Sequence, residues 1–263
     1  MLEIKKLICG YNKGFYLNNI NFKINNGEFV GILGPNGSGK TTLFRAITKI
    51  LPIKKSQIFL NTKDIKEMTL KDLAKELAVV SQSIEKTPDY INVFDYILMG
   101  RSPHRKLFQF VENRHDIEIA QMSMLLTNVF DFKERPISEL SGGERQRVFV
   151  SRAIAQEPKI LLLDEPTTYL DIGHQIELLD LLKKLNKTRK ITVIVILHDL
   201  NLAGIYCDRL ILMNNGEIYK DGAPEEVLTY ENIENVYKTL VVVEKSPITK
   251  KPYVFVIPRR SYK

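Results

Sequence analysis

The sequence predicts an α/β fold: a mixed sheet with helices on both faces, joined to a small antiparallel β subdomain and a helical insertion. Two short apolar runs, 159–163 and 191–197, are typical of strands buried in a parallel sheet, and an amphipathic helix at 173–185 separates them. This order favours a right-handed parallel crossover. Between about residues 82 and 154 apolar residues recur at helical spacing with almost no strand pattern, which indicates the insertion.

The other elements follow from the same patterns, in chain order. Alternation of apolar and polar residues predicts that the three opening runs form the small antiparallel sheet, and the helix after the third run stops before Pro52. The Asn214-Asn215-Gly216 turn predicts a hairpin. The predicted strands are 2–11, 20–24, 28–34, 77–81, 209–213, 217–219 and 253–257, and the predicted helices are 40–50, 93–99, 117–126, 142–154, 224–228 and 231–237.

The composition is that of a globular protein, since 44% of the 263 residues are apolar and 26% are charged. No apolar run approaches the roughly 18 residues of a membrane-spanning helix. Lys5 and Lys6 interrupt the apolar stretch that a signal peptide would need, so we expect a cytosolic protein. Its two cysteines, Cys9 and Cys207, are expected to be buried thiols.

A net charge of +7 invites a nucleic-acid-binding interpretation, but the position of the charge argues against it. Residues 245–263 carry six basic groups and no acidic one, so the preceding 244 residues have a net charge of only +1. No nucleic-acid partner is expected. In this tail we expect 253–257 to pair as a strand and Arg259, Arg260 and Lys263 to be mobile.

Residues 34–41 follow the pattern G-x-x-x-x-G-K-T between an apolar strand and a helix. The glycines let backbone N–H groups turn toward one point, which the positive end of the helix dipole also faces, so a polyphosphate fits there. Lys40 is expected to bind the β- and γ-phosphates, and the Thr41 hydroxyl to bind Mg²⁺. A plain glycine turn would require neither residue. The expected nucleotide contacts are Gly34, Pro35, Asn36, Gly37, Ser38, Gly39, Lys40, Thr41 and Thr42.

The apolar run 160–163 ends in two carboxylates, Asp164 and Glu165, at the carboxyl edge of a buried strand. Asp164 is expected to hold Mg²⁺, and Glu165 to orient or deprotonate the water that attacks the γ-phosphate. A strand ending in two acids is often only a solvated turn. Its combination with the glycine loop favours the catalytic interpretation.

Residues 140–147, Leu-Ser-Gly-Gly-Glu-Arg-Gln-Arg, together with these two motifs, closely resemble the ATP-binding subunits of ABC transporters. The resemblance covers nearly the whole chain and implies a P-loop NTPase core. Ser141, Gly142 and Gly143 at a helix N-terminus form a second anion site. In the family, that site completes the ATP pocket of a second copy, so that two ATP molecules lie within a head-to-tail homodimer. Ser141 and Glu144 also fit a capping box, which does not require the two glycines.

The resemblance implies roles for four more residues. Tyr11 matches the aromatic residue that stacks on adenine; the alternative is an exposed tyrosine at a strand end. Gln82 matches the glutamine that contacts Mg²⁺ and the attacking water, and it begins the insertion. Asp171 matches the aspartate that reaches across the dimer, and His198 the histidine that contacts the γ-phosphate. The expected organisation is one domain, 1–263, with 1–82 and 155–263 as the core and about 83–154 as the helical subdomain carrying the 140–147 motif.

A narrower resemblance lies in the segments 99–104 (MGRSPH), 170–175 (LDIGHQ) and 198–208. They resemble importers of ferric siderophores, haem or cobalamin, a group that includes some molybdate or tungstate systems. This implies a peripheral subunit at the cytoplasmic face of the membrane, docked on integral permease subunits and served indirectly by a solute-binding protein. The rival class is a soluble ABC ATPase acting on DNA, ribosomes or metal-cluster assembly. The long heptad insertion or tandem ATPase units of such proteins are absent from the sequence.

The insertion is expected to contact the permease, because Gln82 links it to the nucleotide. Its apolar and aromatic residues outnumber what a small helical layer can bury, so some are expected to be exposed as a groove for a short permease helix. The alternative is that all of them form the insertion's own core. These residues are Ile91, Val93, Phe94, Tyr96, Ile97, Met99, Leu107, Phe108 and Phe110.

Overall fold

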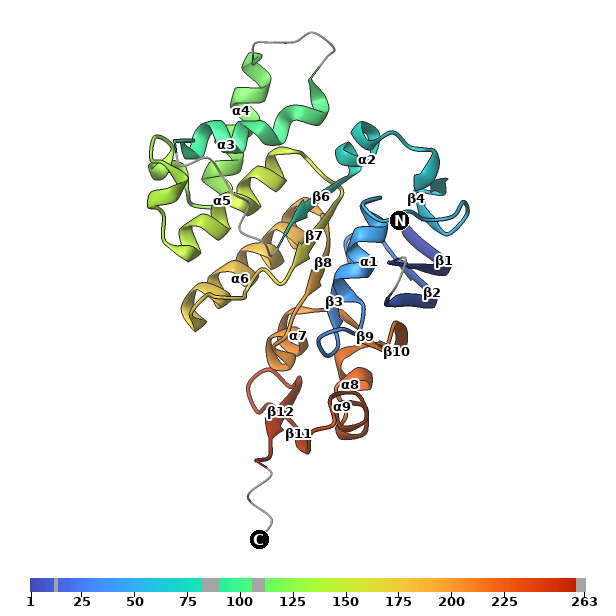
Figure 1. The fold of residues 1–263 in the computed structure, drawn as a ribbon. Helices are drawn as coiled ribbons and strands as arrows, with labels where there is room; N and C mark the ends of the chain where they lie inside the picture. The colour runs from blue at the N-terminus through green and yellow to red at the C-terminus, as the bar shows by residue number, and fades with distance from the viewer. Residues whose placement is uncertain (12–13, 82–89, 106–111, 259–263) are drawn as a thin grey trace. The chain divides into compact units, whose positions relative to one another are not determined.

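The computed structural model describes residues 1–11, 14–81, 90–105 and 112–258 (Figure 1). The chain forms two compact units, Met1–Met68 with Thr192–Lys263, and Thr69–Ile191. The predicted division at 82/83 and 154/155 stays a prediction. Seven residues singled out above lie outside the described ranges: Gln82, Leu107, Phe108, Phe110, Arg259, Arg260 and Lys263.

Two sheets organise the first unit. In the antiparallel sheet, β1 pairs with β2 on one side and β4 on the other, and β5 follows β4. In the other, β3 lies between β8 and β9 and is parallel to both, while β10 is antiparallel to β9. The bounds are β1 Leu2–Gly10, β2 Tyr16–Ile24, β3 Phe29–Leu33, β4 Ile58–Leu60, β5 Lys63–Asp64, β8 Thr192–Ile196, β9 Arg209–Asn214 and β10 Glu217–Gly222. The mixed sheet and the antiparallel sheet confirm the predicted fold class.

The sequence prediction was wrong about the third opening run. We expected 28–34 to join the antiparallel sheet, but β3 is a parallel strand of the mixed sheet. All five of its residues are buried, so it lacks the alternation of a strand that has one face in water. β4 and β5, which complete the antiparallel sheet in its place, are too short to leave an alternating pattern.

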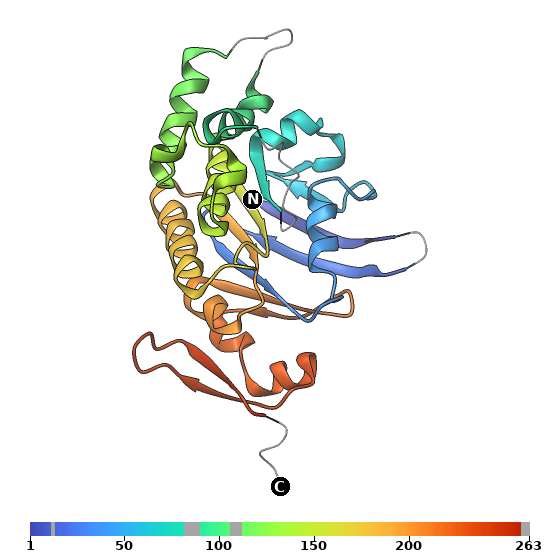
Figure 2. The same cartoon turned by 60° about the vertical axis from the view of Figure 1, so that its left-hand side comes forward.

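The C-terminal part of the first unit is helical and ends in a hairpin (Figure 2). As predicted, the tail contains a strand, since β12 pairs antiparallel with β11. The Asn201 side chain holds β12: its Oδ1 accepts from Val254 N–H (2.7 Å) and its Nδ2 donates to Val254 O (3.2 Å). The helices of this part are α7 Leu200–Tyr206, α8 Pro224–Val227 and α9 Tyr230–Tyr237, and the hairpin strands are β11 Val241–Lys245 and β12 Pro252–Val256; the first unit also contains α1 Lys40–Ile47, which follows β3.

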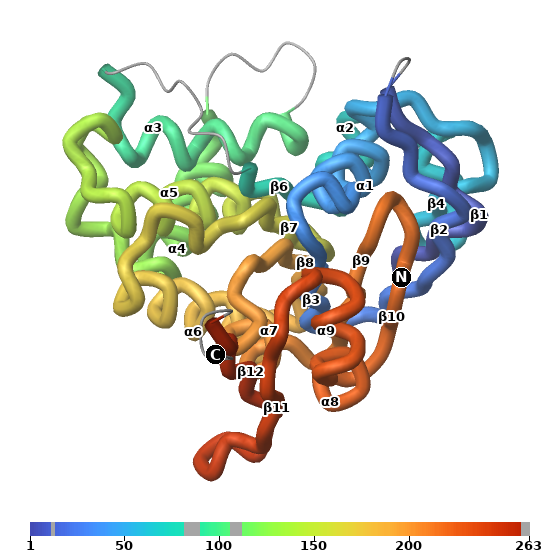
Figure 3. The backbone as a smooth tube through the Cα atoms, turned by 60° about the horizontal axis from the view of Figure 1, so that its bottom comes forward, coloured from blue at the N-terminus to red at the C-terminus, as the bar shows by residue number. Residues whose placement is uncertain are grey.

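The second unit combines two parallel strands with a helical layer. β6 Leu77–Val80 pairs with β7 Ile160–Asp164 in parallel. Helices α3, α4 and α5 surround a common apolar core and lie together in Figure 3. The helices are α2 Leu70–Glu76, α3 Val93–Leu98, α4 Arg114–Leu126, α5 Gly142–Ala155 and α6 Ile172–Arg189. The helical insertion is therefore present, and α2, which we did not predict, precedes β6.

The described aromatic and apolar residues of the insertion mainly form its own core. Val93, Tyr96 and Ile97 are buried, and the partly buried Ile91 and Phe94 pack against the same core. Met99 remains exposed. For these residues the structure contradicts the predicted groove and favours the alternative, because α4 and α5 together cover the apolar face of α3.

Both cysteines are buried thiols outside any disulfide, as predicted, and burial raises the pKa of Cys9 to about 11. Within the described ranges, no helix has the length and apolar character needed to span a bilayer.

Candidate functional site

The predicted phosphate loop connects β3 to α1 and is shaped by glycines. Gly34, Gly37 and Gly39 have φ values of +145°, +81° and +107°, which side chains other than glycine rarely tolerate. A Cβ atom at Gly34 would lie 2.3 Å from Met213 O, and one at Gly39 would lie 2.6 Å from Leu17 Cδ2. The loop therefore rests directly on β9 and β2, and only glycine fits at these two positions.

Lys40 is buried at the start of α1. Its Nζ donates to Gly34 O (2.8 Å) and to Pro35 O (3.0 Å), so the ammonium group lies against the loop. The first N–H groups of a helix have no intrahelical acceptor, which makes this terminus suited to an anion. The Ser38 hydroxyl is also buried and has no hydrogen-bond partner among the described residues. These donors fit the phosphate groups of a nucleotide.

Two contacts that we did not predict support this loop. Gly216 N–H donates to Ser38 O (3.0 Å), so the turn between β9 and β10 braces the loop. Tyr237, at the end of α9, is partly buried and its hydroxyl lies beside Gly34; desolvation raises its pKa to about 12, and the Gly34 backbone acts in the opposite direction. Neither contact could be recognised in the sequence, because each joins segments that lie far apart in the chain.

Tyr11 lies just beyond β1 and is 39% exposed. Its hydroxyl accepts a hydrogen bond from Arg45 Nη1 of α1 (2.6 Å), and its N–H donates to Phe15 O (3.3 Å). A Cβ atom added to Gly39 would lie 2.9 Å from Cε1 and Cζ of the Phe15 ring. Tyr11 is therefore bonded to α1 and to Phe15, and its side chain is partly exposed to solvent.

His198 follows β8 and is exposed. β8 pairs with β3 in parallel, up to the pair Ile196 and Ile32, and Leu197 N–H donates to Ile32 O (3.3 Å). Because both strands end at the same edge, His198 and the phosphate loop share one side of the sheet. Asp199 then caps α7 by accepting from Asn201 N–H (2.8 Å) and Leu202 N–H (2.9 Å).

In the second unit, Asp164 is the buried last residue of β7. Glu165 has a φ of +52°, an uncommon left-handed conformation that costs on the order of 1 kcal/mol or more for a residue with a side chain. Thr168 N–H donates to Glu165 O (3.2 Å) and closes the turn. Backbone strain of this kind is frequent at active sites, and here it occurs at the residue expected to be the base.

The 140–147 motif begins α5. Ser141 is its N-cap: the Ser141 Oγ accepts from Glu144 N–H (3.3 Å), and Glu144 Oε2 accepts from Ser141 N–H (2.8 Å). The bond from the Ser141 backbone lowers the pKa of Glu144. The predicted capping box therefore exists, and it leaves the helix N-terminus at Gly142 and Gly143 with the geometry of an anion site.

Asp171 is the N-cap of α6. Its Oδ1 accepts from His174 N–H (2.9 Å) and its Oδ2 lies 2.7 Å from His174 Nδ1. These bonds, the backbone one first, lower the pKa of Asp171. The His174 ring also contacts α5, because a Cβ added to Gly143 would lie 2.2 Å from His174 Cδ2. His174 was not among the predicted site residues; its only sequence signal was its place in the LDIGHQ segment.

The two units thus hold two sets of predicted site residues. The first contains the phosphate loop, Tyr11 and His198, and the second contains the carboxylates Asp164 and Glu165, the α5 N-terminus and Asp171. The described residues include no cluster of three His, Cys, Asp or Glu side chains that could hold a metal. Mg²⁺ bound with a nucleotide does not need one, since phosphates and water supply most of its ligands.

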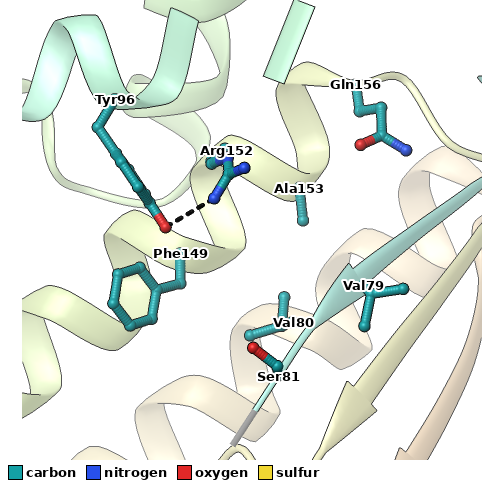
Figure 4. A pocket seen from close by; sticks show the side chains of 8 residues that line it. All are labelled: Val79, Val80, Ser81, Tyr96, Phe149, Arg152, Ala153 and Gln156. Atoms are coloured by element: carbon teal, nitrogen blue, oxygen red, sulfur yellow. Dashed lines mark hydrogen bonds between the residues drawn. The ribbon is translucent and has the colours of Figure 1, made fainter. Parts of the chain in front are cut away.

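A small pocket of about 60 Å³ lies in the second unit, at the end of β6 (Figure 4). Tyr96 and Arg152 form one wall, where Arg152 Nη1 donates to Tyr96 Oη (2.9 Å) and the guanidinium lies 4.7 Å from the ring centroid. The pocket thus adjoins Ser81, the last residue before the predicted site residue Gln82. It is lined by Val79, Val80, Ser81, Tyr96, Phe149, Arg152, Ala153 and Gln156.

Comparison with known proteins gives consistent matches. A family model described as ABC transporter matches residues 17–168. The petrobactin import ATP-binding protein FpuC of Bacillus anthracis is 38% identical over 99% of this chain and 93% of its own. The iron(3+)-hydroxamate import ATP-binding protein FhuC of Bacillus subtilis is 36% identical over 95% of this chain and 93% of its own. An uncharacterised ABC transporter ATP-binding protein of Bacillus subtilis, YvrA, is 39% identical over 98% of this chain, which spans only 58% of that protein.

Solved structures agree on the fold. A chain of an ABC transporter assigned to the metal-chelate type, in an inward-facing conformation, has a TM-score of 0.84 and 28% identity, covering 98% of this chain and 96% of its own. The dimeric ATP-binding cassette MJ0796, bound to ADP and Pi, has a TM-score of 0.74 and 28% identity, covering 85% of this chain and 99% of its own.

Proposed function

Because the chain belongs to the ABC transporter family of ATP-binding proteins, which are ATPases, we propose that it is the ATP-hydrolysing subunit of an importer of an iron(3+) chelate. The observation that best supports ATP binding is the turn formed by Gly34, Gly37 and Gly39, against which the buried Lys40 ammonium group lies. The substrate class rests on the resemblance of segments 99–104 and 170–175 to metal-chelate importers and on the names of FpuC and FhuC.

ATP binding is proposed to use the phosphate loop and α1. Lys40 Nζ exchanges its carbonyl acceptors for phosphate oxygens, and the helix N-terminus and the loop amides stabilise the remaining charge. Thr41 and Asp164, with Gln82, are proposed to hold Mg²⁺, which neutralises phosphate charge when bound. Ser38 adds a buried hydroxyl, and Tyr11 offers a ring face for adenine.

Hydrolysis is proposed to use Glu165 as the group that orients or deprotonates the attacking water. His198, at the same sheet edge as the phosphate loop, contacts the γ-phosphate oxygens. Lys40 stabilises the charge that develops on the transferred phosphoryl group. Glu165 receives its position from β7 and from its left-handed backbone conformation.

A second copy of the chain is proposed to complete each ATP site. Ser141, Gly142 and Gly143 lie at the α5 N-terminus, where the first N–H groups of a helix have no intrahelical acceptor, and Asp171 is linked to Gly143 through the His174 ring. Two ATP molecules are therefore held between two copies. The assembly is proposed to be peripheral, on the cytoplasmic face of the membrane beneath the permease subunits, with a solute-binding protein as an indirect partner.

Other solutes, such as haem, cobalamin, molybdate or tungstate, are the alternatives within the same role, and a soluble ABC ATPase is the alternative of another class. Deletion of the gene followed by uptake of a ⁵⁵Fe-labelled ferric siderophore tests the proposal: uptake is expected to fall and to return with the wild-type gene. Normal iron uptake with impaired growth on another solute would reassign the substrate. ATPase activity without a membrane partner in pull-downs would favour the soluble class.

Tyr11→Ala is expected to weaken ATP and GTP binding equally, by about 1 to 3 kcal/mol, because a ring that stacks on the base contributes on that order and the phosphate contacts remain. Titration with fluorescent nucleotide measures the change. Tyr11→Phe keeps the ring and loses only the bond from Arg45, so it should bind almost normally. Tyr230→Ala, which removes another exposed tyrosine, is the matched control. Unchanged affinity in Tyr11→Ala would favour the alternative of an exposed tyrosine without a role.

The pocket at the end of β6 is proposed to receive part of the permease, in place of the groove first expected along the insertion. It combines apolar walls with Arg152 and Tyr96, and it adjoins the segment that starts at Gln82, through which nucleotide binding can be transmitted. Val79, 44% exposed, lies at its edge.

Val79→Asp is expected to reduce co-purification of the permease by about tenfold or more, because a carboxylate replaces apolar surface in the contact. Met122→Asp, at another exposed apolar position of the same unit, serves as the control and should co-purify normally. Melting temperatures of both variants check folding. Wild-type recovery of permease with a folded Val79→Asp would exclude the pocket.

A further inference from the structure

His174 touches both segments that this chain is proposed to offer to the second copy's ATP. Its backbone N–H and its Nδ1 both bond the Asp171 carboxylate, at 2.9 and 2.7 Å. Its ring occupies the space above Gly143, since an added Cβ there would lie 2.2 Å from Cδ2, 2.7 Å from Cγ and 2.8 Å from Nε2. One side chain therefore connects the N-terminus of α6 to the N-terminus of α5.

The hydrogen bond to Asp171 determines which nitrogen of the His174 ring carries a proton. An ionised carboxylate only accepts hydrogen bonds, so Nδ1 must carry a proton and donate. The backbone and side-chain bonds together hold the carboxylate in one orientation, because each oxygen has its own donor. With χ1 and χ2 thus restrained, the ring presents a fixed face to Gly143.

Neighbouring contacts keep the two helices in register. One turn further along, Arg147 Nη1 of α5 pairs with Glu177 Oε2 of α6 at 3.0 Å. The loop before α6 is braced by Gln175, whose Nε2 donates to Thr167 O (3.2 Å) and Leu170 O (3.1 Å). A Cβ on Gly142 would come within 3.8 Å of Leu170 Cδ2. These contacts attach α5 to the loop, and the His174 side chain joins the two N-termini.

We propose that His174 is a positioning residue, which sets the distance between Asp171 and the Ser141-Gly142-Gly143 turn so that both meet the second copy's nucleotide at once. This rests on the proposed function. It also explains the second glycine of the turn: Gly143 must lack a side chain because the imidazole takes that place. His174 itself needs no contact with ATP.

The test uses the full chain in the Glu165→Gln background, where ATP-bound dimers are expected to accumulate. His174→Ala should weaken ATP-dependent dimerisation by about ten- to a hundredfold, the loss expected for a hydrogen bond to a charged group. ATP affinity of the dilute monomer and the melting temperature should stay near those of the parent, which a general structural defect would change. His174→Asn, whose amide can still donate to Asp171, should recover part of the dimerisation. His115→Ala, at an exposed histidine of α4, is the matched control.

A double-mutant cycle examines the contact with Gly143. Gly143→Ala alone should impair dimerisation, because its methyl group collides with the ring, and the same change should cost less once His174 is alanine. If the losses in dimerisation from Gly143→Ala and His174→Ala simply add in the double variant, the inference is overturned. A His174→Ala chain that dimerises like its parent, or one that loses ATP affinity and stability in parallel, would overturn it as well. A Glu165→Gln parent that stays monomeric with ATP would overturn the proposed function, and the inference with it.

Discussion

Replacement of Glu165 with Gln is expected to leave ATP binding intact while turnover falls by on the order of 10² to 10⁴, the usual contribution of a positioned general base. The amide has the size of the carboxylate, and the turn held by Thr168 N–H to Glu165 O is a backbone contact that the change preserves. Only the capacity to accept the water's proton is lost. A steady-state ATPase assay and a nucleotide titration separate the two effects.

The same variant should accumulate as an ATP-bound dimer, because the bound nucleotide is no longer consumed. Gel filtration with ATP and Mg²⁺ detects the dimer. Glu118→Gln, which alters an exposed carboxylate of α4, is the control and should hydrolyse ATP at the wild-type rate. A turnover near wild type in Glu165→Gln would remove this residue from the role of base.

Lys40→Ala is expected to reduce ATP affinity by about ten- to a hundredfold, since hydrogen bonds to charged groups contribute about 1.5 to 3 kcal/mol. Turnover should fall further, by on the order of 10² to 10³, because the ammonium group also stabilises charge that develops during phosphoryl transfer. The variant loses the two bonds from Lys40 Nζ to the loop, but the glycine conformations and the bond from Gly216 N–H to Ser38 O do not involve this side chain, so the fold should be retained. Isothermal titration and single-turnover hydrolysis measure the two losses separately.

Lys49→Ala is the matched control at the other end of α1, where the Lys49 Nζ likewise donates to a carbonyl, Met68 O, at 2.6 Å. It should bind and hydrolyse ATP normally. If both lysine variants lose affinity equally, the effect belongs to the stability of α1 and not to phosphate binding. Circular dichroism of the two variants distinguishes these cases.

The glycine-rich loop of residues 34–41 could be predicted from its residues alone because its backbone geometry is local. A turn that needs positive φ at Gly34 and Gly39 requires glycines at fixed positions within a few residues, which the sequence shows directly. The capping box of Ser141 and Glu144 likewise spans a single helical turn. Helices α5 and α6 were predicted for the same reason, because each repeats its apolar residues along one continuous segment, whereas the short helices α2 and α7 were missed. Roles that were assigned by resemblance, such as that of His198, remain proposals.

Contacts between distant segments could not be recognised in this way, because no local sequence pattern specifies them. The sheet that Phe29–Leu33 joins depends on which strands pair with its two edges. These are β8 and β9, which lie more than 150 residues later in the chain. Likewise, an aromatic residue at helical spacing can line a groove or a core, and Tyr96 is buried because α5 covers it. The place of His174 against Gly143 arises when two helix N-termini meet. The sequence alone therefore determined the glycine-rich turn and the capping box, through short-range backbone geometry. Strand partners, burial and the contacts that support the turn required the folded chain, since they depend on packing between segments remote in sequence.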